Sequence, residues 1–311
     1  MLVILAGGVG AARFLQGLVQ VVSPAELTVV VNTADDLELH GLHVSPDLDS
    51  VLYHLAGLAD AGRGWGVRDE TFHALDLLGR YGADTWFQLG DRDLATHIYR
   101  TRLLREGLPL SAATDRMRRA LGVGCRLLPM TDARVATAVQ TPDGWLPFQV
   151  YFVQRQCADT VLGVAFEGVE GATPGPGVLE AIGAAEGVIL APSNPIVSLG
   201  PILAVPGVRD AIRDTPAPVA AISPIVGGAA IKGPADRMLR DLGHEPSALG
   251  VAAHYGALLD AFVLDTVDAA LAPRVEALGI RALVTNTIMR GPAEKAALAR
   301  ATLSALGLGP G

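Results

Sequence analysis

The stretch Leu5–Leu18, LAGGVGAARFLQGL, places three glycines within four residues and continues as an amphipathic run. Residues 2–6 (LVILA) lead into it as a short apolar run, which is typical of a buried parallel strand. From Ala11 onward the apolar side chains follow helical spacing, at Phe14, Leu15, Leu18, Val19 and Val22. Residues 27–31 (LTVVV) then predict a second buried strand. The chain therefore begins with a strand, a glycine turn, a helix and a strand.

The same alternation continues along the chain. Four more apolar runs predict strands, at residues 85–89, 187–191, 219–223 and 282–285. Strands that alternate with helical patterns predict an α/β protein with a parallel sheet covered by helices on both faces. Residues 134–153 alternate around Pro142-Asp143-Gly144, which indicates a hairpin.

The domain organisation follows from a change in composition. Residues 63–121 are richer in charge and in helix-forming residues than the rest of the chain. We therefore predict a mainly helical insertion or lid over 63–121, and a nucleotide-binding core over 1–62 and 122–311. A length of 311 residues suits such a core with one insertion.

Composition excludes several classes of protein. Half of the residues are apolar and 18% are charged, which indicates a packed globular chain. The net charge of -8 argues against non-specific nucleic-acid binding. The longest uncharged stretch, Thr215–Ile231, is too short and too rich in proline to span a membrane. We expect a cytoplasmic protein. Cys125 and Cys157 are too few for a disulfide framework, and only two lysines accompany 22 arginines.

Polar residues collect just after the predicted strands, where ligands bind in open α/β sheets. The candidate residues, strand by strand, are Gly7, Gly8 and Gly10, then Asn32, Asp35 and Asp36, then Arg92, then Ser193 and Asn194, and finally Lys232. We expect these loops to face one cleft.

The glycine turn suits an anion. Without Cβ atoms the main-chain N–H groups approach a phosphate closely, and the following helix N-terminus adds a favourable dipole. The alternative is a tight turn without a ligand. A dinucleotide motif is incomplete, because Arg13 stands where its last glycine belongs and Asn32 stands where an acid would bind the ribose.

The carboxylates suggest a cation site. Asp35 and Asp36 form either a solvated turn or part of a Mg²⁺ site. Residues 45–49 (SPDLD) open a helix with Ser45 as a natural N-cap, and a structural role accounts for at least one of its acids. Asp47 and Asp49 lie about 200° apart on a helix, so at most one of them points toward Asp35.

The remaining candidates, Arg92, Ser193, Asn194 and Lys232, are weighed as ligand contacts or as residues with an ordinary structural role. Arg92 lies between Asp91 and Asp93, where a local ion pair is as plausible as a ligand contact. Ser193-Asn194, held between prolines, suits the edge of a base or sugar. Lys232 lies in a Gly/Pro turn that suits a phosphate contact, or is an ordinary surface lysine.

Taken together, the motifs resemble the 2-phospho-L-lactate transferase family of coenzyme F420 biosynthesis. The matching pieces follow the family's order: GGVGAARFLQGL (7–18), VNTADD (31–36), SPDLDSVLYHLAG (45–57), RGWGVRDET (63–71), WFQLGDRDLATH (86–97), APSNPIVSLGPILAVPG (191–207) and SPIVGGAAIKGPA (223–235).

The resemblance implies a Rossmann-like core with a helical subdomain in a homodimer. It also implies a reaction. A guanosine diphosphate-linked three-carbon acid, lactate or enolpyruvate, gives its phospho-acid to the ribityl hydroxyl of the deazaflavin Fo. GMP is released, and Mg²⁺ is required.

Carried over by position, Asp35 and Asp49 resemble the metal and acceptor-hydroxyl carboxylates, the catalytic pair. The chemistry of the transfer itself suggests that one of these two aspartates, or Asp36, takes the hydroxyl proton. Gly8, Gly10 and Asn194 resemble donor contacts. One departure is Asn286, which stands where the family leads us to expect an aspartate.

Two other classes of protein remain as alternatives. The related gluconeogenesis-factor proteins share the core and bind nucleotide sugars as regulators. A glycine- and serine-rich segment is expected after their acids, whereas this chain has residues 37–41 (LELHG). The incomplete dinucleotide motif weakens the third class, an NAD(P)-dependent dehydrogenase.

Overall fold

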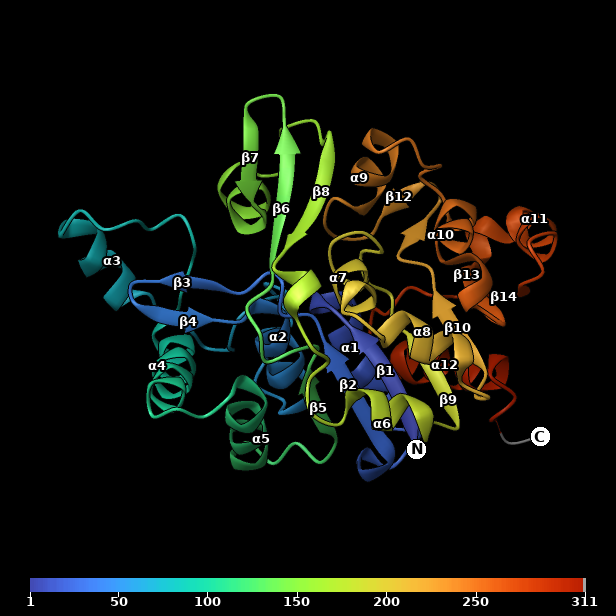
Figure 1. Ribbon diagram of the computed structural model, residues 1–311, viewed down its shortest axis with the longest axis horizontal. Coiled ribbons are helices and arrows are strands. Elements are labelled where there is room, and N and C mark those ends of the chain that lie inside the picture. The colour runs from blue at the N-terminus through green and yellow to red at the C-terminus, as the bar shows by residue number, and fades with distance from the viewer. Residues whose placement is uncertain (310–311) are drawn as a thin grey trace.

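The computed structural model describes residues 1–309 and has a seven-stranded parallel sheet at its centre (Figure 1). The sheet order is β14-β13-β10-β9-β1-β2-β5. Its strands are β1 (Leu2–Ala6), β2 (Leu27–Val31), β5 (Arg126–Pro129), β9 (Gly187–Leu190), β10 (Val219–Ile222), β13 (Ala261–Asp265) and β14 (Arg281–Thr285). This is a Rossmann-like α/β fold, as predicted.

The order in which strands are added to the sheet reverses at β1: β2 and β5 lie on one side of it, and β9, β10, β13 and β14 lie on the other. β1 pairs with β2 on one side and with β9 on the other, and all these pairs are parallel. Such a reversal is the topological switch point at which α/β proteins bind ligands. The turns that follow β1 and β9 therefore lie side by side at the carboxyl edge of the sheet.

Helices cover both faces of the sheet and make three layers. On one face Ile4 and Val29 pack under α1 (Gly8–Leu18), α2 (Pro46–Leu55) and α12 (Pro292–Ala305). On the other face Val3 and Leu5 pack under helices from the second half of the chain. Those helices are α6 (Val178–Gly183), α7 (Leu199–Ala204), α8 (Val208–Asp214), α9 (Ala235–Asp241), α10 (Ala248–Tyr255) and α11 (Ala272–Glu276).

Residues 63–121 contain α3 (His73–Arg80), α4 (Asp91–Arg105) and α5 (Leu110–Ala120). A short hairpin, β3 (Leu37–Leu39) and β4 (Leu42–Val44), joins them from earlier in the chain and packs on α4. Figure 1 shows α3, α4 and this hairpin projecting from one side of the sheet. The division of the chain into core and insertion remains a prediction.

A second small sheet has the order β7-β6-β8, with β6 (Ala136–Thr141), β7 (Gly144–Pro147) and β8 (Gly163–Glu167). The hairpin predicted around Pro142–Gly144 is thus confirmed, and β8 extends it. Two-residue strands, β11 (Ile225–Val226) and β12 (Ala229–Ala230), form one more hairpin.

The strand predicted at 85–89 is wrong. These residues form an irregular segment that leads into α4, and only Leu89 among them is buried. Phe87 and Leu89 pack against the β3–β4 hairpin instead of joining the sheet. Aromatic and branched side chains are typical of strands, which is why the pattern predicted one here. A parallel strand must be buried on both faces, and this segment is not. The sequence also failed to indicate β5 and β13.

Across residues 1–309, no helix combines the length and apolar character needed to cross a membrane.

The close contact between α1 and the turn after β9 yields a stability prediction. A Cβ on Gly10 would overlap the main-chain carbonyl oxygen of Pro192, which cannot rotate away. We expect Gly10→Ala to lower the free energy of unfolding by about 1–3 kcal/mol or more, because overpacking shifts the backbone.

The measurement is urea unfolding of this variant beside Gly183→Ala, in which the new Cβ meets nothing within 4 Å. Both glycines are helical, so the control removes the helix-propensity effect. Equal stability of the two variants would contradict the prediction.

Candidate active site at the carboxyl edge of the sheet

A cavity of about 620 Å³ opens at the switch point. This volume is typical of sites for small molecules. Eight of the candidate residues line it: Gly7, Gly8, Gly10, Asp35, Asp49, Ser193, Asn194 and Lys232. Asn32, Asp36 and Arg92 are not part of the lining. The expected convergence of distant loops on one cleft is therefore present.

The glycine turn forms the floor beside the N-terminus of α1. Gly7 is the N-cap residue, and its amide and carbonyl both bond to the Ser193 hydroxyl, at 3.3 and 2.7 Å. Gly8 has φ +69°, a conformation that favours glycine. A Cβ on Gly7 would lie 2.5 Å from that of Ser198, so no larger side chain fits. The turn leaves the helix N-terminus open to an anion.

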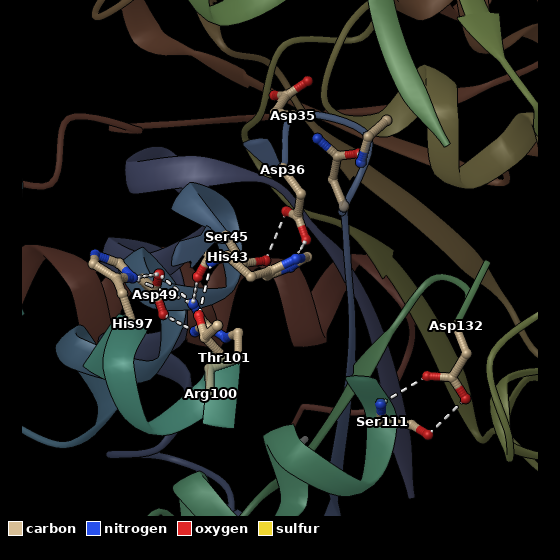
Figure 2. Close-up of polar contacts among 12 residues, drawn as sticks. Asp35, Asp36, His43, Ser45, Asp49, His97, Arg100, Thr101, Ser111 and Asp132 are labelled. Atoms are coloured by element: carbon tan, nitrogen blue, oxygen red, sulfur yellow. Dashed lines mark hydrogen bonds and ion pairs between the residues drawn. The ribbon is translucent and has the colours of Figure 1, made fainter. Parts of the chain in front are cut away.

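Asp35 and Asp36 have different surroundings, and their carboxylates point in opposite directions (Figure 2). Asp36 accepts hydrogen bonds from Ser45 Oγ at 2.6 Å and faces His43 Nε2 at 2.9 Å. The Ser45 hydroxyl therefore donates to Asp36, and the side-chain hydrogen bond expected from Ser45 as the N-cap of α2 is absent. Asp35 is buried, and its Oδ1 has no hydrogen-bond partner.

Asp47 is a cavity acid that sequence analysis did not select. It lies in the first turn of α2, lines the cavity and is buried. Its Oδ1 would lie 3.2 Å from a Cβ on Gly8, so the carboxylate rests against the glycine turn. The helical angle between Asp47 and Asp49 indicated that only one would face Asp35, but the phase of the helix was not available from the sequence.

Asn32 positions this carboxylate. The asparagine is fully buried at the end of β2, and its Nδ2 donates to Asp47 Oδ2 at 3.0 Å. Its Oδ1 accepts from the main-chain N–H of Ala34 at 2.9 Å. Asn32, which stands where a dinucleotide-binding protein has an acid, therefore holds the carboxylate of Asp47 in place.

Asp35 and Asp47 are two neighbouring buried acids, and both have raised pKa values. Burial raises the pKa of Asp35 well above its usual value, and the charge of Asp47 raises it further. Burial also raises the pKa of Asp47, to about 7, although the hydrogen bond from Asn32 opposes this. A bound cation would relieve both shifts.

Asp49 faces a different partner. Arg100 of α4 forms a two-pronged ion pair with it, in which Nη1 lies 3.1 Å from Oδ2. Both side chains are buried. Figure 2 shows Asp49 between Arg100 and His97. His97 joins this cluster, with Nδ1 at 3.6 Å from Asp49 and Nε2 at 3.1 Å from Asp93. Tyr53 donates its hydroxyl hydrogen to Asp93.

The segment around Arg92 has a structural role. Asp91 accepts hydrogen bonds from the main-chain N–H groups of His73 and Ala74, and so caps the start of α3. Arg92 is exposed and donates to the carbonyl of Arg68 at 2.8 Å. Asp93 and His97 of the next turn line the cavity.

The remaining candidates are held by local contacts. Asn194 Oδ1 accepts from the Ile196 N–H at 2.9 Å, which fixes the loop after β9. Lys232 Nζ donates to the carbonyl of Gly64 at 2.8 Å and so joins two loops across the cavity. Asn286 is exposed and makes a turn by accepting from the Ile288 N–H, whereas the residues after it line the cavity.

The acids fit a divalent cation only as a half-site. Within residues 1–309 no group of three or more histidine, cysteine or acidic side chains is placed to hold a metal ion. Asp35 offers a buried oxygen without a partner, and Asp47 lies close enough to perturb it. Two carboxylates that leave room for phosphate oxygens and water are typical of Mg²⁺. Asp49 as a metal ligand remains a prediction, because Arg100 already neutralises it.

Fold and site together define a Rossmann-like α/β protein with an anion-binding turn and buried acids at its switch point. The family model for the 2-phospho-L-lactate transferase CofD matches residues 2–282. The chain belongs to this family, and it is a transferase.

Individual relatives agree along the whole chain. A phosphoenolpyruvate transferase of Streptomyces griseus is 48% identical over 309 residues, covering 97% of both chains. The enzyme of the same name from Mycolicibacterium smegmatis is 41% identical, covering 98% of both chains. A 2-phospho-L-lactate transferase of Methanosarcina mazei is 38% identical, covering 98% of this chain and 100% of its own.

A solved structure supports the fold. The UPF0052-family protein of Bacillus halodurans superposes with a TM-score of 0.60 at 18% identity, over 92% of each chain. At that identity the likeness concerns the fold alone.

The buried ion pair yields a prediction about stability. Arg100→Met would leave the charge of Asp49 buried without a partner, which costs about 3–5 kcal/mol of unfolding free energy. Arg102→Met, on the same helix, breaks only an exposed pair with Glu106 and is expected to cost at most about 1 kcal/mol. Urea unfolding measures both, and similar losses would show that the buried pair is not special.

A further prediction concerns pH. The pKa of Asp47 is raised in the folded chain, so protonation stabilises the fold, and this stability is lost as pH rises from about 4 to about 7. We expect Asp47→Asn to melt several degrees higher than the native chain above that range, in the presence of EDTA. The gain should shrink toward the acidic end.

The control is Asp69→Asn, at an exposed acid. Its melting difference should be the same at both ends of the range. A melting difference for Asp47→Asn that does not change with pH would contradict the assignment.

Proposed function

We propose that this chain transfers a phospho-three-carbon-acid group from a guanosine diphosphate-linked donor to the ribityl hydroxyl of the deazaflavin Fo. GMP is the leaving product, Mg²⁺ the cofactor, and the pathway that of coenzyme F420. We further propose that the group is phosphoenolpyruvyl, because relatives named for that group are 41–48% identical whereas the Methanosarcina mazei enzyme is 38% identical. A cytoplasmic homodimer is part of the same proposal.

One observation carries the proposal. A glycine turn at a helix N-terminus and two buried carboxylates, Asp35 and Asp47, face the same cavity at the switch point. The turn supplies N–H groups to an anionic donor, and the acids supply a place for a cation. A nucleotide-sugar regulator would need the first feature but not the second.

The reaction needs little covalent help from the protein. The acceptor hydroxyl oxygen attacks the phosphorus that carries the three-carbon acid, forming a new P–O bond. The anhydride P–O bond to GMP breaks, and GMP leaves with that electron pair. The hydroxyl proton passes to a carboxylate. Placement and charge neutralisation therefore supply most of the catalysis.

The residues divide these tasks. Asp35 and Asp47 would hold Mg²⁺, and the bound ion would neutralise charge on the bridging oxygens. Gly7, Gly8 and Gly10 bind the donor through main-chain N–H groups. One of the two buried acids takes the hydroxyl proton, because both carboxylates face the cavity in which the acceptor hydroxyl must lie. Asp49 holds α4 through Arg100.

The test is a turnover assay with Fo, Mg²⁺ and each guanylylated three-carbon acid, read by mass spectrometry of the product. The native chain should release GMP only when Fo is present. Binding of a nucleotide sugar without any turnover would favour the regulator, and a change in NAD(P)H absorbance the dehydrogenase.

Two conservative variants separate the acids. Asp35→Asn and Asp47→Asn should each lower kcat by about 10²-fold or more, since each removes a charge that acts on the transition state. They should also raise the Mg²⁺ concentration needed for half-maximal rate. Full turnover by Asp35→Asn would exclude the metal assignment.

The comparison variant is Asp49→Asn, which keeps the shape of the side chain beside Arg100. It should lose stability while its Mg²⁺ requirement stays unchanged. A shifted Mg²⁺ requirement in this variant would return Asp49 to the metal site.

A further inference from the structure

A cluster of positive charge shares the cavity with the acids through two of its members, Arg13 and Lys232. It consists of Arg13 of α1, Lys232 of the loop after β12 and Lys295 of α12, and we call it the basic cluster. Burial lowers the pKa of each lysine, and the charge of Arg13 lowers it further, so both lysines lie within electrostatic reach of Arg13. The chain has no other lysine than these two.

The basic cluster has no counter-charge. Within the described residues 1–309 none of its three members forms an ion pair, and each donates to a neutral oxygen instead. Arg13 donates to the Met289 carbonyl at 2.6 Å, Lys232 to the Gly64 carbonyl at 2.8 Å, and Lys295 to Gln16 Oε1 at 2.6 Å. Three neighbouring cations repel one another, so an anion bound among them would be stabilised. In a protein of net charge -8, such an arrangement indicates a binding site.

The position of the basic cluster relates it to the donor. Arg13 and Lys232 line the same cavity as the glycine turn. Arg13 follows Gly8 by five residues, which is about 7.5 Å along the axis of α1. Its guanidinium is held at the carbonyl of Met289, a residue that also lines the cavity. The turn and Arg13 therefore offer two places in one cavity for the anionic groups of one ligand.

We propose that the basic cluster, centred on Arg13, is the subsite that binds the carboxylate of the transferred three-carbon acid. This inference rests on the proposed function, in which that carboxylate is the one anionic group of the donor outside the diphosphate. A guanidinium matches a carboxylate with two parallel hydrogen bonds, and it keeps its charge at all working pH values. The subsite holds the acid end of the donor while the diphosphate lies between the turn and the acids.

The consequence is selection by charge. A donor that carries the carboxylate would contact both the glycine turn and the basic cluster, whereas GDP or GMP would contact only the turn. The basic cluster therefore sets affinity for the complete donor without changing affinity for the nucleotide.

The main test uses Arg13→Gln and the charge-conserving Arg13→Lys. We measure KM for the guanylylated acid, KM for Fo, and the inhibition constants of GDP and GMP. Arg13→Gln should raise the donor KM by about 10-fold or more, because a charge-assisted contact is lost. The KM for Fo and both inhibition constants should stay within about twofold. Arg13→Lys should recover part of the loss.

Three further variants serve as controls for this test. Arg13 also holds the Met289 carbonyl, so Lys232→Met and Lys232→Arg at an exposed position repeat the comparison without that contact. Arg213→Gln removes an exposed arginine that pairs with Asp210 and is not part of the cavity lining. It should leave all four constants unchanged.

Each outcome is decisive. A parallel weakening of GDP and GMP inhibition would place a nucleotide phosphate on the basic cluster and overturn the carboxylate assignment. An unchanged donor KM in Arg13→Gln and Lys232→Met, with a native chain that turns over, would overturn the subsite alone. A native chain without turnover on any donor would overturn the proposed function, and the subsite with it.

Discussion

The structure depends on keeping two acids, Asp35 and Asp47, buried beside a glycine turn. Placing like charges together away from water is unfavourable, and the fold accepts it only with support. Asn32 holds Asp47 by a hydrogen bond, and the glycine turn lets its carboxylate approach the main chain. A bound cation would stabilise the charged form of this pair.

The helix that carries Asp47 also explains how the helical region is attached. Two residues further along α2, Asp49 also borders the cavity but pairs with Arg100 of α4. One helical turn therefore supplies an acid without a cationic partner and an acid in a buried ion pair. Because His97, Asp93 and Tyr53 continue this network, α4 forms one wall of the cavity.

The cavity carries charges of both signs within a largely apolar lining. Acids from α2, α4 and the loop after β2 contribute to it, and so do Arg13 and Lys232 of the basic cluster. The glycine turn borders the same cavity at the switch point. A donor with a diphosphate and a carboxylate would meet complementary charge along its length, with the acceptor placed against the reacting phosphorus.

The sequence by itself determined strands β1, β2, β9, β10 and β14, the glycine turn, the start of α2 and the family. These features depend on neighbouring residues: continuous apolar runs, a helical period, and motifs in a fixed order. The tertiary structure alone decided which acid of α2 faces Asp35, because the rotation of a helix is set by packing against α1 and α4. It also decided that residues 85–89 pack on a hairpin rather than in the sheet. The meeting of Arg13, Lys232 and Lys295 was equally invisible, since a contact between residues hundreds of positions apart leaves no local pattern.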